Sequence, residues 1–258
     1  MPKSLSVVLI TLNEAANLPR TLASVRLISE AMEEIVVVDS GSADGTVEIA
    51  RQAGAQVFEE PWKGFGAQKN SAIDHATGDW ILSLDADEEI GAELAREIQT
   101  LLAGEPEFAA YDIPRLNHFL GRPLKHGGYW PDPKLRLFRR GAARFEERAV
   151  HETVKAAGPV GRLRNPLIHR CYPTLEEYIE HANRYSTLGA QMLAAGGRGG
   201  GPLAWNAVVN PAATFLYNYV FRLGFLDGRE GLLQHLNHSI YVHWKFAKAW
   251  RMARGKSS

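Results

Sequence analysis

Short apolar runs that alternate with helical segments fill the first ninety residues and constrain the fold more than any other feature. Runs of strand length occupy residues 5–11, 35–38, 56–58 and 81–84. Between them, apolar residues recur at helical spacing, as Leu18, Leu22 and Val25 do. Short strands that alternate with helices imply a parallel sheet covered on both faces. We therefore expect an α/β fold with a Rossmann-like, mostly parallel sheet.

Polar residues follow three of these runs directly. Asn13 and Glu14 come just after the first run, Asp39 ends the second, and residues 85–89 (Asp-Ala-Asp-Glu-Glu) follow the fourth. Ligands bind at the carboxyl ends of the strands in open α/β sheets. The predicted topology would therefore gather these side chains in one crevice.

The acidic run at 85–89 is the strongest chemical signal. Carboxylates at the end of a buried strand repel one another unless a cation neutralises them. Strand geometry points Asp85 and Asp87 to the same side, which gives oxygen ligands suited to Mg²⁺ or Mn²⁺. The alternative is a solvated acidic turn, in which Glu88 and Glu89 favour the N-terminus of the next helix.

Composition excludes several classes of protein. Lys and Arg total 29 and Asp and Glu total 29, so no global charge points to a nucleic-acid partner. Cys171 is the only cysteine, which excludes a disulfide framework and a cysteine zinc site. The N-terminal apolar run is too short for a signal peptide, so we expect a cytoplasmic protein.

The chain after residue 104 changes character twice. Residues 105–172 contain short strand-like runs separated by Gly- and Pro-rich turns, and residues 175–195 have helical spacing. We expect one catalytic domain at 1–172, with a donor half at 1–104 and an acceptor half at 105–172. Residues 173–258 would form a C-terminal helical region.

The last helix has two contrasting faces. Residues 203–226 are apolar but interrupted by Asn206, Asn210 and Asn218, which argues against a membrane span. A basic amphipathic helix with Trp and Phe suits the surface of an anionic membrane. The alternative is an ordinary helix docked on the protein. The apolar face comprises Val242, Phe246, Ala249, Trp250 and Ala253, and the basic face comprises Lys245, Lys248 and Arg251.

Four motifs in fixed order carry a family resemblance: ThrLeuAsnGlu at 11–14, ValValValAspSerGlySerAlaAspGlyThr at 36–46, GlyPheGlyAlaGlnLysAsn at 64–70 and AspAlaAsp at 85–87. Together they resemble the family 2 glycosyltransferases of the GT-A fold. The later motifs ValHisGlu at 150–152 and GlyPheLeuAspGly at 224–228 are similar to the bacterial branch that adds sugars to the lipopolysaccharide core.

The resemblance implies an inverting, metal-dependent transfer of a hexose from a nucleotide sugar, usually a UDP-sugar, to a lipid-linked saccharide. Asp39 would accept a hydrogen bond from the base, Lys69 would offset the diphosphate charge, and Asp87 would be the main ligand of the metal. From the residues alone, Asn13 and Glu14 are equally consistent with a helix cap, and Lys69 with a solvated helix lysine. The donor side would comprise Thr11, Asn13, Glu14, Asp39, Ser40, Asp44, Lys69, Asp85 and Ala86.

The acceptor side is less specific. An inverting displacement needs a base for the acceptor hydroxyl, and Glu152 or its neighbour His151 is the candidate. The resemblance also makes His169 a candidate third metal ligand beside Asp85 and Asp87, although a lone His after a strand is also consistent with a structural role. Arg136 and Arg139 are interpreted as sharing one strand face, from which they would bind a phosphate of the donor or the acceptor; the alternative is a surface edge on which both are paired.

These expectations describe a glycosyltransferase that lies on the inner face of the cell membrane, with a nucleotide-sugar donor, a lipid-linked acceptor and an anionic membrane surface as partners. Two alternatives remain open. One is a nucleotidyltransferase with a similar sheet, although the residues after the first strand lack its Gly-rich basic signature. The other is an inactive nucleotide-sugar-binding or membrane scaffold protein.

Overall fold

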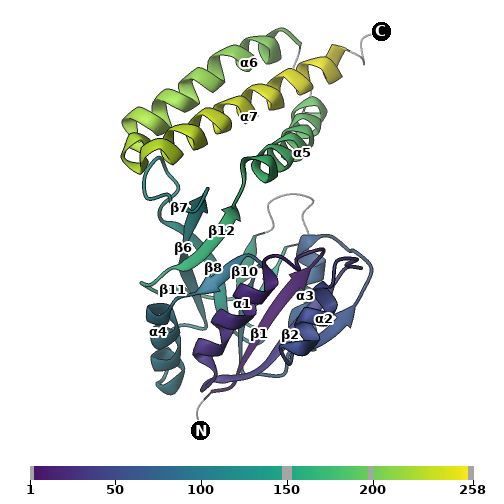
Figure 1. Ribbon diagram of the computed structural model, residues 1–258, viewed down its shortest axis with the longest axis vertical. Coiled ribbons are helices and arrows are strands. Elements are labelled where there is room, and N and C mark those ends of the chain that lie inside the picture. The colour runs from purple at the N-terminus through teal and green to yellow at the C-terminus, as the bar shows by residue number, and fades with distance from the viewer. Residues whose placement is uncertain (1–2, 147–152, 197–199, 255–258) are drawn as a thin grey trace. The chain divides into compact units, whose positions relative to one another are not determined.

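A computed structural model describes residues 3–146, 153–196 and 200–254 of the chain. The chain divides into two compact units, shown in Figure 1. The first unit comprises Met1–Arg115 and Asp132–His169, and the second comprises Leu116–Pro131 and Arg170–Ser258. The segment Leu116–Pro131, which the sequence assigned to the acceptor half, thus groups with the C-terminal helices.

The first unit contains the predicted parallel strands. They are β1 (Leu5–Thr11), β2 (Met32–Asp39), β3 (Gln56–Glu59) and β4 (Trp80–Leu84), which lie in the order β3-β2-β1-β4. All three neighbouring pairs are parallel, so the carboxyl ends of the strands lie at one edge. The β-branched run Val36, Val37 and Val38 is fully buried, as expected for a strand covered on both faces.

The sheet continues with antiparallel strands. β8 (Asp132–Arg139) pairs with β4 and with β6 (Ala110–Phe119), and β12 (Leu167–Tyr172) pairs with β5 (Glu88–Ile90). The full order is β3-β2-β1-β4-β8-β6-β12-β5, with β7 (Arg122–Pro123) and β11 (Val160–Arg162) paired to β6. A separate hairpin joins β9 (Ala143–Phe145) to β10 (Val154–Ala156). Glu88 therefore lies in a strand, and the alternative of a helix-opening acidic turn is wrong.

Helices cover both faces of the parallel strands, which confirms the predicted α/β class. On one face, α1 (Leu18–Val25), α2 (Thr46–Gln52) and α4 (Ala92–Ala103) pack with Val7 of β1. On the other face, α3 (Phe65–His75) packs with Val8 of β1. A short 3₁₀ turn, η1 (Arg26–Ile28), follows α1.

The second unit is mainly helical, as predicted. It contains α5 (Leu175–Ala195), α6 (Gly200–Phe215), a π-helical turn η2 (Leu216–Phe221), a 3₁₀ turn η3 (Gly224–Asp227) and α7 (Gly228–Arg254). Among the described residues, no helix is both long and apolar enough to cross a bilayer.

The apolar face of α7 lies inside this unit. Val242, Phe246 and Ala249 form a buried cluster with residues of α5 and α6. On the predicted basic face, Lys248 donates hydrogen bonds to Asn183 and Ser186 of α5. The apolar face of the last helix is therefore docked against its neighbours and is not free for a membrane, so that part of the sequence interpretation is wrong.

Candidate active site

The ends of β1 and β2 are tied together by a buried hydrogen bond. Thr11 Oγ1 donates to Asp39 Oδ2 at 2.8 Å, and both residues are buried. Asp39 also accepts from the backbone amides of Gly41 and Ser42 and from Ser42 Oγ. Burial alone would raise the pKa of Asp39, but these hydrogen bonds outweigh burial and lower it. Asp39 is therefore a charged anchor for the loop after β2.

The loops after β1 and β2 bind each other. Asn13 has a left-handed backbone (φ 56°). Its side-chain Oδ1 accepts a hydrogen bond from Ala43 N, and its backbone N–H donates to Ser42 Oγ. Asp44 accepts from Ala15 N and from Thr46. Asn is one of the few residues that tolerate φ near +60°. The structure thus brings Asn13 and Asp44 to one rim.

The pKa of Glu14 reflects the acidic residues that surround it. Its pKa is raised, first by burial and further by the charges of Asp87, Asp44 and Asp85, although a hydrogen bond from Asn17 opposes the shift. Carboxylates from the ends of three strands therefore act on one another, as the sequence predicted.

Asp85 is held between two cations. Lys69 Nζ of α3 lies 2.7 Å from Asp85 Oδ1, and Arg136 Nη2 of β8 donates to Asp85 Oδ2. Burial would raise the pKa of Asp85, but Arg136 and Lys69 hold it well below the usual range. Lys69 is only 5% exposed and also lies over the Phe145 ring, so it is not a solvated helix lysine.

Arg136 belongs to a chain of alternating charges. Arg136 Nη2 donates to the fully buried Glu88 at 2.8 Å, and Arg115 bridges Glu88 to Asp132. Glu88 also accepts the amide of Asp85 through Oε2. Lys134 lies 2.9 Å from Asp132. We call this set the charge chain; in order it comprises Lys69, Asp85, Arg136, Glu88, Arg115, Asp132 and Lys134.

Arg136 and Arg139 do not share a face, contrary to the sequence interpretation. Arg136 is 4% exposed, whereas Arg139 is exposed. Successive side chains of a strand alternate between faces, so residues three apart point in opposite directions. Of these two arginines, only Arg136 reaches the carboxylates after β4, which together with Glu14 and Asp44 we call the acidic rim.

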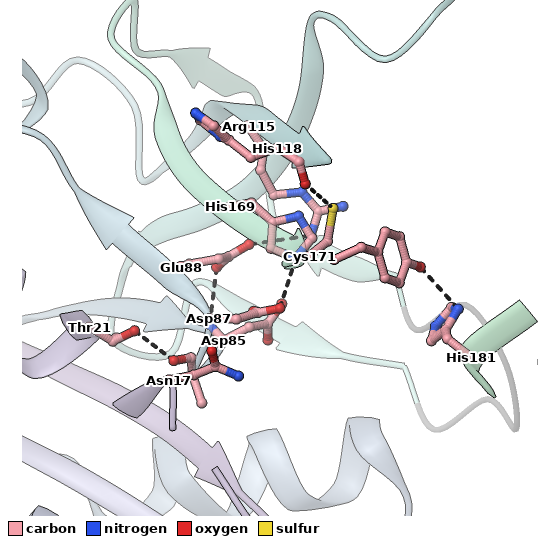
Figure 2. Close-up of polar contacts among 12 residues, drawn as sticks. Asn17, Thr21, Asp85, Asp87, Glu88, Arg115, His118, His169, Cys171 and His181 are labelled. Atoms are coloured by element: carbon pink, nitrogen blue, oxygen red, sulfur yellow. Dashed lines mark hydrogen bonds and ion pairs between the residues drawn. The ribbon is translucent and has the colours of Figure 1, made fainter. Parts of the chain in front are cut away.

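Asp87 points toward a different partner. Its Oδ2 lies 3.1 Å from Nε2 of His169, which comes from β12 (Figure 2). The pairing of β12 with β5 places His169 opposite Glu88, and this register carries the imidazole to the acidic rim. Carboxylate oxygens suit Mg²⁺ and Mn²⁺ and imidazole is the commonest metal ligand in proteins, so these two groups are candidate ligands of a divalent cation. In the described part of the chain, no group of three or more His, Cys, Asp or Glu is arranged to hold a metal.

Five members of the charge chain, all except Glu88 and Asp132, line a cavity of about 530 Å³ within the first unit. The wall of this cavity includes the four cations of the charge chain. Phe145 and Val154 of the β9–β10 hairpin add apolar groups to it. Such a cavity suits a polar, anionic ligand. Its lining includes Lys69, Asp85, Arg115, Lys134, Arg136 and Phe145.

The other predicted residues have varied outcomes. Ala86 is buried, and its carbonyl accepts from Thr21 of α1. Ser40 Oγ is buried and has no hydrogen-bond partner among the described residues. His151 and Glu152, the candidate bases, lie outside the described residues. Sequence reasoning missed Arg115 and the burial of Glu88, which only the long-range pairing of β5 could have shown.

Comparison with known proteins identifies the family. The model of "Glycosyl transferase family 2" matches residues 6–157, which include the whole acidic rim before His169. The chain belongs to glycosyl transferase family 2. It is therefore a glycosyltransferase, which excludes the nucleotidyltransferase alternative.

Relatives and a solved structure agree with this family. The lipopolysaccharide core biosynthesis glycosyltransferase LpsC of Rhizobium meliloti is 32% identical over 96% of this chain and 92% of its own. The uncharacterised glycosyltransferase RP128 of Rickettsia prowazekii is 32% identical over 98% of this chain and 86% of its own. The mannosyltransferase PcManGT of Pyrobaculum calidifontis, solved with GDP-Man and Mn²⁺, covers 96% of this chain and 87% of its own with a TM-score of 0.57 and 16% identity. This family 2 chain thus has the GT-A fold.

Proposed function

We propose that this family 2 glycosyltransferase transfers a hexose from a nucleotide sugar to a lipid-linked saccharide of the lipopolysaccharide core. The proposed donor is a UDP-sugar, and the anomeric carbon is inverted in the transfer. The observation that carries the proposal is the convergence of Lys69, Asp85, Asp87 and His169 at one rim of the sheet. The similarity to LpsC along nearly the whole chain supports the class of acceptor.

The donor would lie along the rim formed by β1, β2 and β4. Asp39 and the loop that it anchors would bind the nucleoside, and Lys69 would balance the diphosphate charge. The cavity beside Asp85, whose wall carries four cations, would hold the diphosphate end of the donor and the sugar attached to it. Residues on this side would be Thr11, Asn13, Glu14, Asp39, Ser40, Asp44, Lys69, Asp85 and Ala86.

A divalent cation would be held by Asp87 and His169, with Asp85 nearby. When bound, Mg²⁺ or Mn²⁺ supplies positive charge that stabilises the departing nucleoside diphosphate. Asp87 is the preferred ligand because Asp85 already has two cationic partners. His169 would bind the cation through an unprotonated Nε2.

The transfer needs a base on the acceptor side. The acceptor hydroxyl oxygen would attack the anomeric carbon, and the bond from that carbon to the diphosphate oxygen would break with its electrons on the leaving group. Glu152 or His151 would take the hydroxyl proton. The lipid-linked acceptor would bring the enzyme to the inner face of the cell membrane as a peripheral protein.

The test is a donor and metal screen on the whole chain. UDP-sugars and GDP-mannose are incubated with truncated lipopolysaccharide core acceptors, with Mn²⁺, with Mg²⁺ or with a chelator, and transfer is measured. We expect transfer from one donor class and its loss with the chelator. Nucleotide binding without turnover under any condition would favour the inactive scaffold.

Matched variants separate the roles of the acidic residues. Asp87→Asn should lose Mn²⁺-dependent nucleotide binding, while Asp74→Asn, an exposed aspartate of α3 paired with Arg144, should keep it. Glu152→Gln should retain donor binding and lose transfer, and His151→Asn tests the other candidate base. Normal Mn²⁺-dependent affinity in Asp87→Asn would refute the metal assignment.

A further inference from the structure

The second unit exposes large apolar side chains along α6 and α7, among them Trp205, Val208 and Leu236, and most densely in the turns η2 and η3 that join these helices. Phe221 is 75% exposed, Tyr217 is 58% exposed and Leu226 is 51% exposed. Large apolar patches on a protein surface mark sites of interaction. We call this surface the apolar tip; its main members are Leu216, Tyr217, Phe221, Leu223, Phe225 and Leu226.

The tip is built on a fixed base. Gly127 N donates to Arg222 O at 2.8 Å, and the buried Asp227 accepts the amides of Lys125 and His126. Leu223 adopts a left-handed backbone (φ 60°), which is uncommon for leucine, and its side chain is 47% exposed. The backbone behind the tip is therefore well bonded while its apolar side chains face outward.

The charges around the tip are positive. Lys125, Arg222 and Arg229 are exposed, and none of them forms an ion pair within the described part of the chain. The acidic residues nearby are already engaged, because Asp227 contacts His126 and Glu230 lies 3.7 Å from Arg122. Between Gly200 and Leu226 the sequence contains no acidic residue. Apolar and aromatic side chains ringed by cations complement an anionic lipid surface.

We propose that the apolar tip inserts into the interface of an anionic membrane, so that this enzyme lies on the bilayer through the turns η2 and η3. This proposal deepens the proposed function and rests on it for the lipid-linked acceptor. It replaces the face of α7 that carries Val242, Phe246 and Ala249 as the contact, since that face is buried against α5 and α6. The 27 residues of α7 span about 40 Å, which separates its basic end at Arg251 and Arg254 from the tip.

A second copy of the chain is a poorer occupant. Two tips that packed against each other would bring Lys125, Arg222 and Arg229 of each copy together without acidic partners. Lipid phosphates would instead neutralise these cations. Tyr and Arg beside Phe and Leu are also the side chains that favour the boundary between headgroups and acyl chains.

The test is co-sedimentation of the full chain with vesicles of phosphatidylcholine, alone or mixed with phosphatidylglycerol. We expect binding to the mixed vesicles. Phe221→Ser/Leu226→Ser should lower the partition coefficient about 100-fold, since each buried apolar side chain contributes about tenfold. Ile179→Ser/Met192→Ser removes two exposed apolar side chains of α5 and should bind normally. Circular dichroism checks that both variants fold.

A charge variant gives an independent readout. Lys125→Gln/Arg229→Gln should weaken binding to the phosphatidylglycerol vesicles and reduce its dependence on salt. Undiminished sedimentation of the Phe221/Leu226 variant, or an equal loss in the α5 variant, would overturn the proposal. A wild-type dimer in solution that this variant converts to a monomer would also overturn it, because a second copy would then cover the tip.

The outcomes separate this proposal from the proposed function. The tip variant should keep the wild-type rate of donor hydrolysis, because its substitutions lie in the second unit. A wild type that binds vesicles but turns over no nucleotide sugar would refute the proposed function alone. A wild type that transfers sugar but ignores anionic vesicles would refute the tip alone.

Discussion

Replacing Arg136 should lower the stability of the protein by leaving the buried carboxylates beside it without their cation. Arg136 is 4% exposed and donates to both Asp85 and the fully buried Glu88. Arg136→Met keeps most of the side-chain volume but leaves two carboxylates short of a cation. Breaking a buried ion pair from one side costs about 3–5 kcal/mol, because a charge stays buried without its partner. We expect a loss of that size in the free energy of unfolding at neutral pH.

The loss should depend on pH in a defined direction. In the wild type, Arg136 and Lys69 outweigh burial and hold the pKa of Asp85 well below the unfolded value of 3.8. A carboxyl with a lowered folded-state pKa stabilises the protein above its unfolded pKa, and this stabilisation disappears as pH falls through the folded pKa. The difference between wild type and Arg136→Met should therefore be largest at neutral pH and shrink below about pH 4.

The assay is urea unfolding across a pH series, with hydrogen exchange of β4 and β8 as the local readout. Arg139→Met, the same change at an exposed position of the same strand, should stay within about 0.5 kcal/mol of wild type. Glu88→Gln/Arg136→Met should recover part of the loss, since one orphaned charge is removed. A cost for Arg136→Met no larger than that of Arg139→Met at neutral pH would refute the reasoning.

Three further predictions concern other buried polar groups. Thr11→Val removes a donor to the buried Asp39 and should lower stability by about 1–3 kcal/mol in a urea titration. Asp227→Asn should weaken the base of the apolar tip, seen as faster hydrogen exchange at Lys125 and His126. Burial, with His235 and Lys245, lowers the pKa of His238 from 6.5 to about 4. Between pH 6.5 and pH 4 the unfolded chain therefore binds more protons than the folded protein. The free energy of unfolding should fall by about 3 kcal/mol over this range, and by much less in His238→Gln.

The parallel half of the sheet could be predicted because its signals are local. The continuous apolar run Val36, Val37 and Val38 is typical of a strand that is covered on both faces, and Asp39 follows this run directly. Once the strands are parallel, the positions of Asn13, Asp39 and Asp85 at one edge follow from topology. The contact of His169 with Asp87 could be proposed only through the family resemblance, since 82 residues separate them.

Two features escape the sequence because the partners lie far away in the chain, whereas the error on Arg136 and Arg139 comes from local strand alternation. The sequence leaves Glu88 equally consistent with the first turn of a helix, and its place in the fold follows only from the pairing of β12 with β5 and from its contacts with Arg115 and Arg136. The sequence predicts that the apolar face of α7 contacts a membrane, but in the structure α5 and α6 cover this face. Conversely, the exposure of Phe221 and Leu226 follows from turns η2 and η3 that periodicity does not reveal.

The carboxylates of the acidic run at 85–89 are not all neutralised in the same way. Carboxylates at 85–89 need positive charge, and the sequence favoured a single metal ion as the source. In the structure Asp85 and Glu88 obtain that charge from Lys69, Arg136 and Arg115, which are part of the fold. Asp87 lies 3.1 Å from the imidazole of His169 and has no Lys or Arg partner among the ion pairs of the described residues. The acidic run thus lacks a fixed cation of the fold at Asp87, which favours Asp87 and His169 as the centre of the proposed metal site.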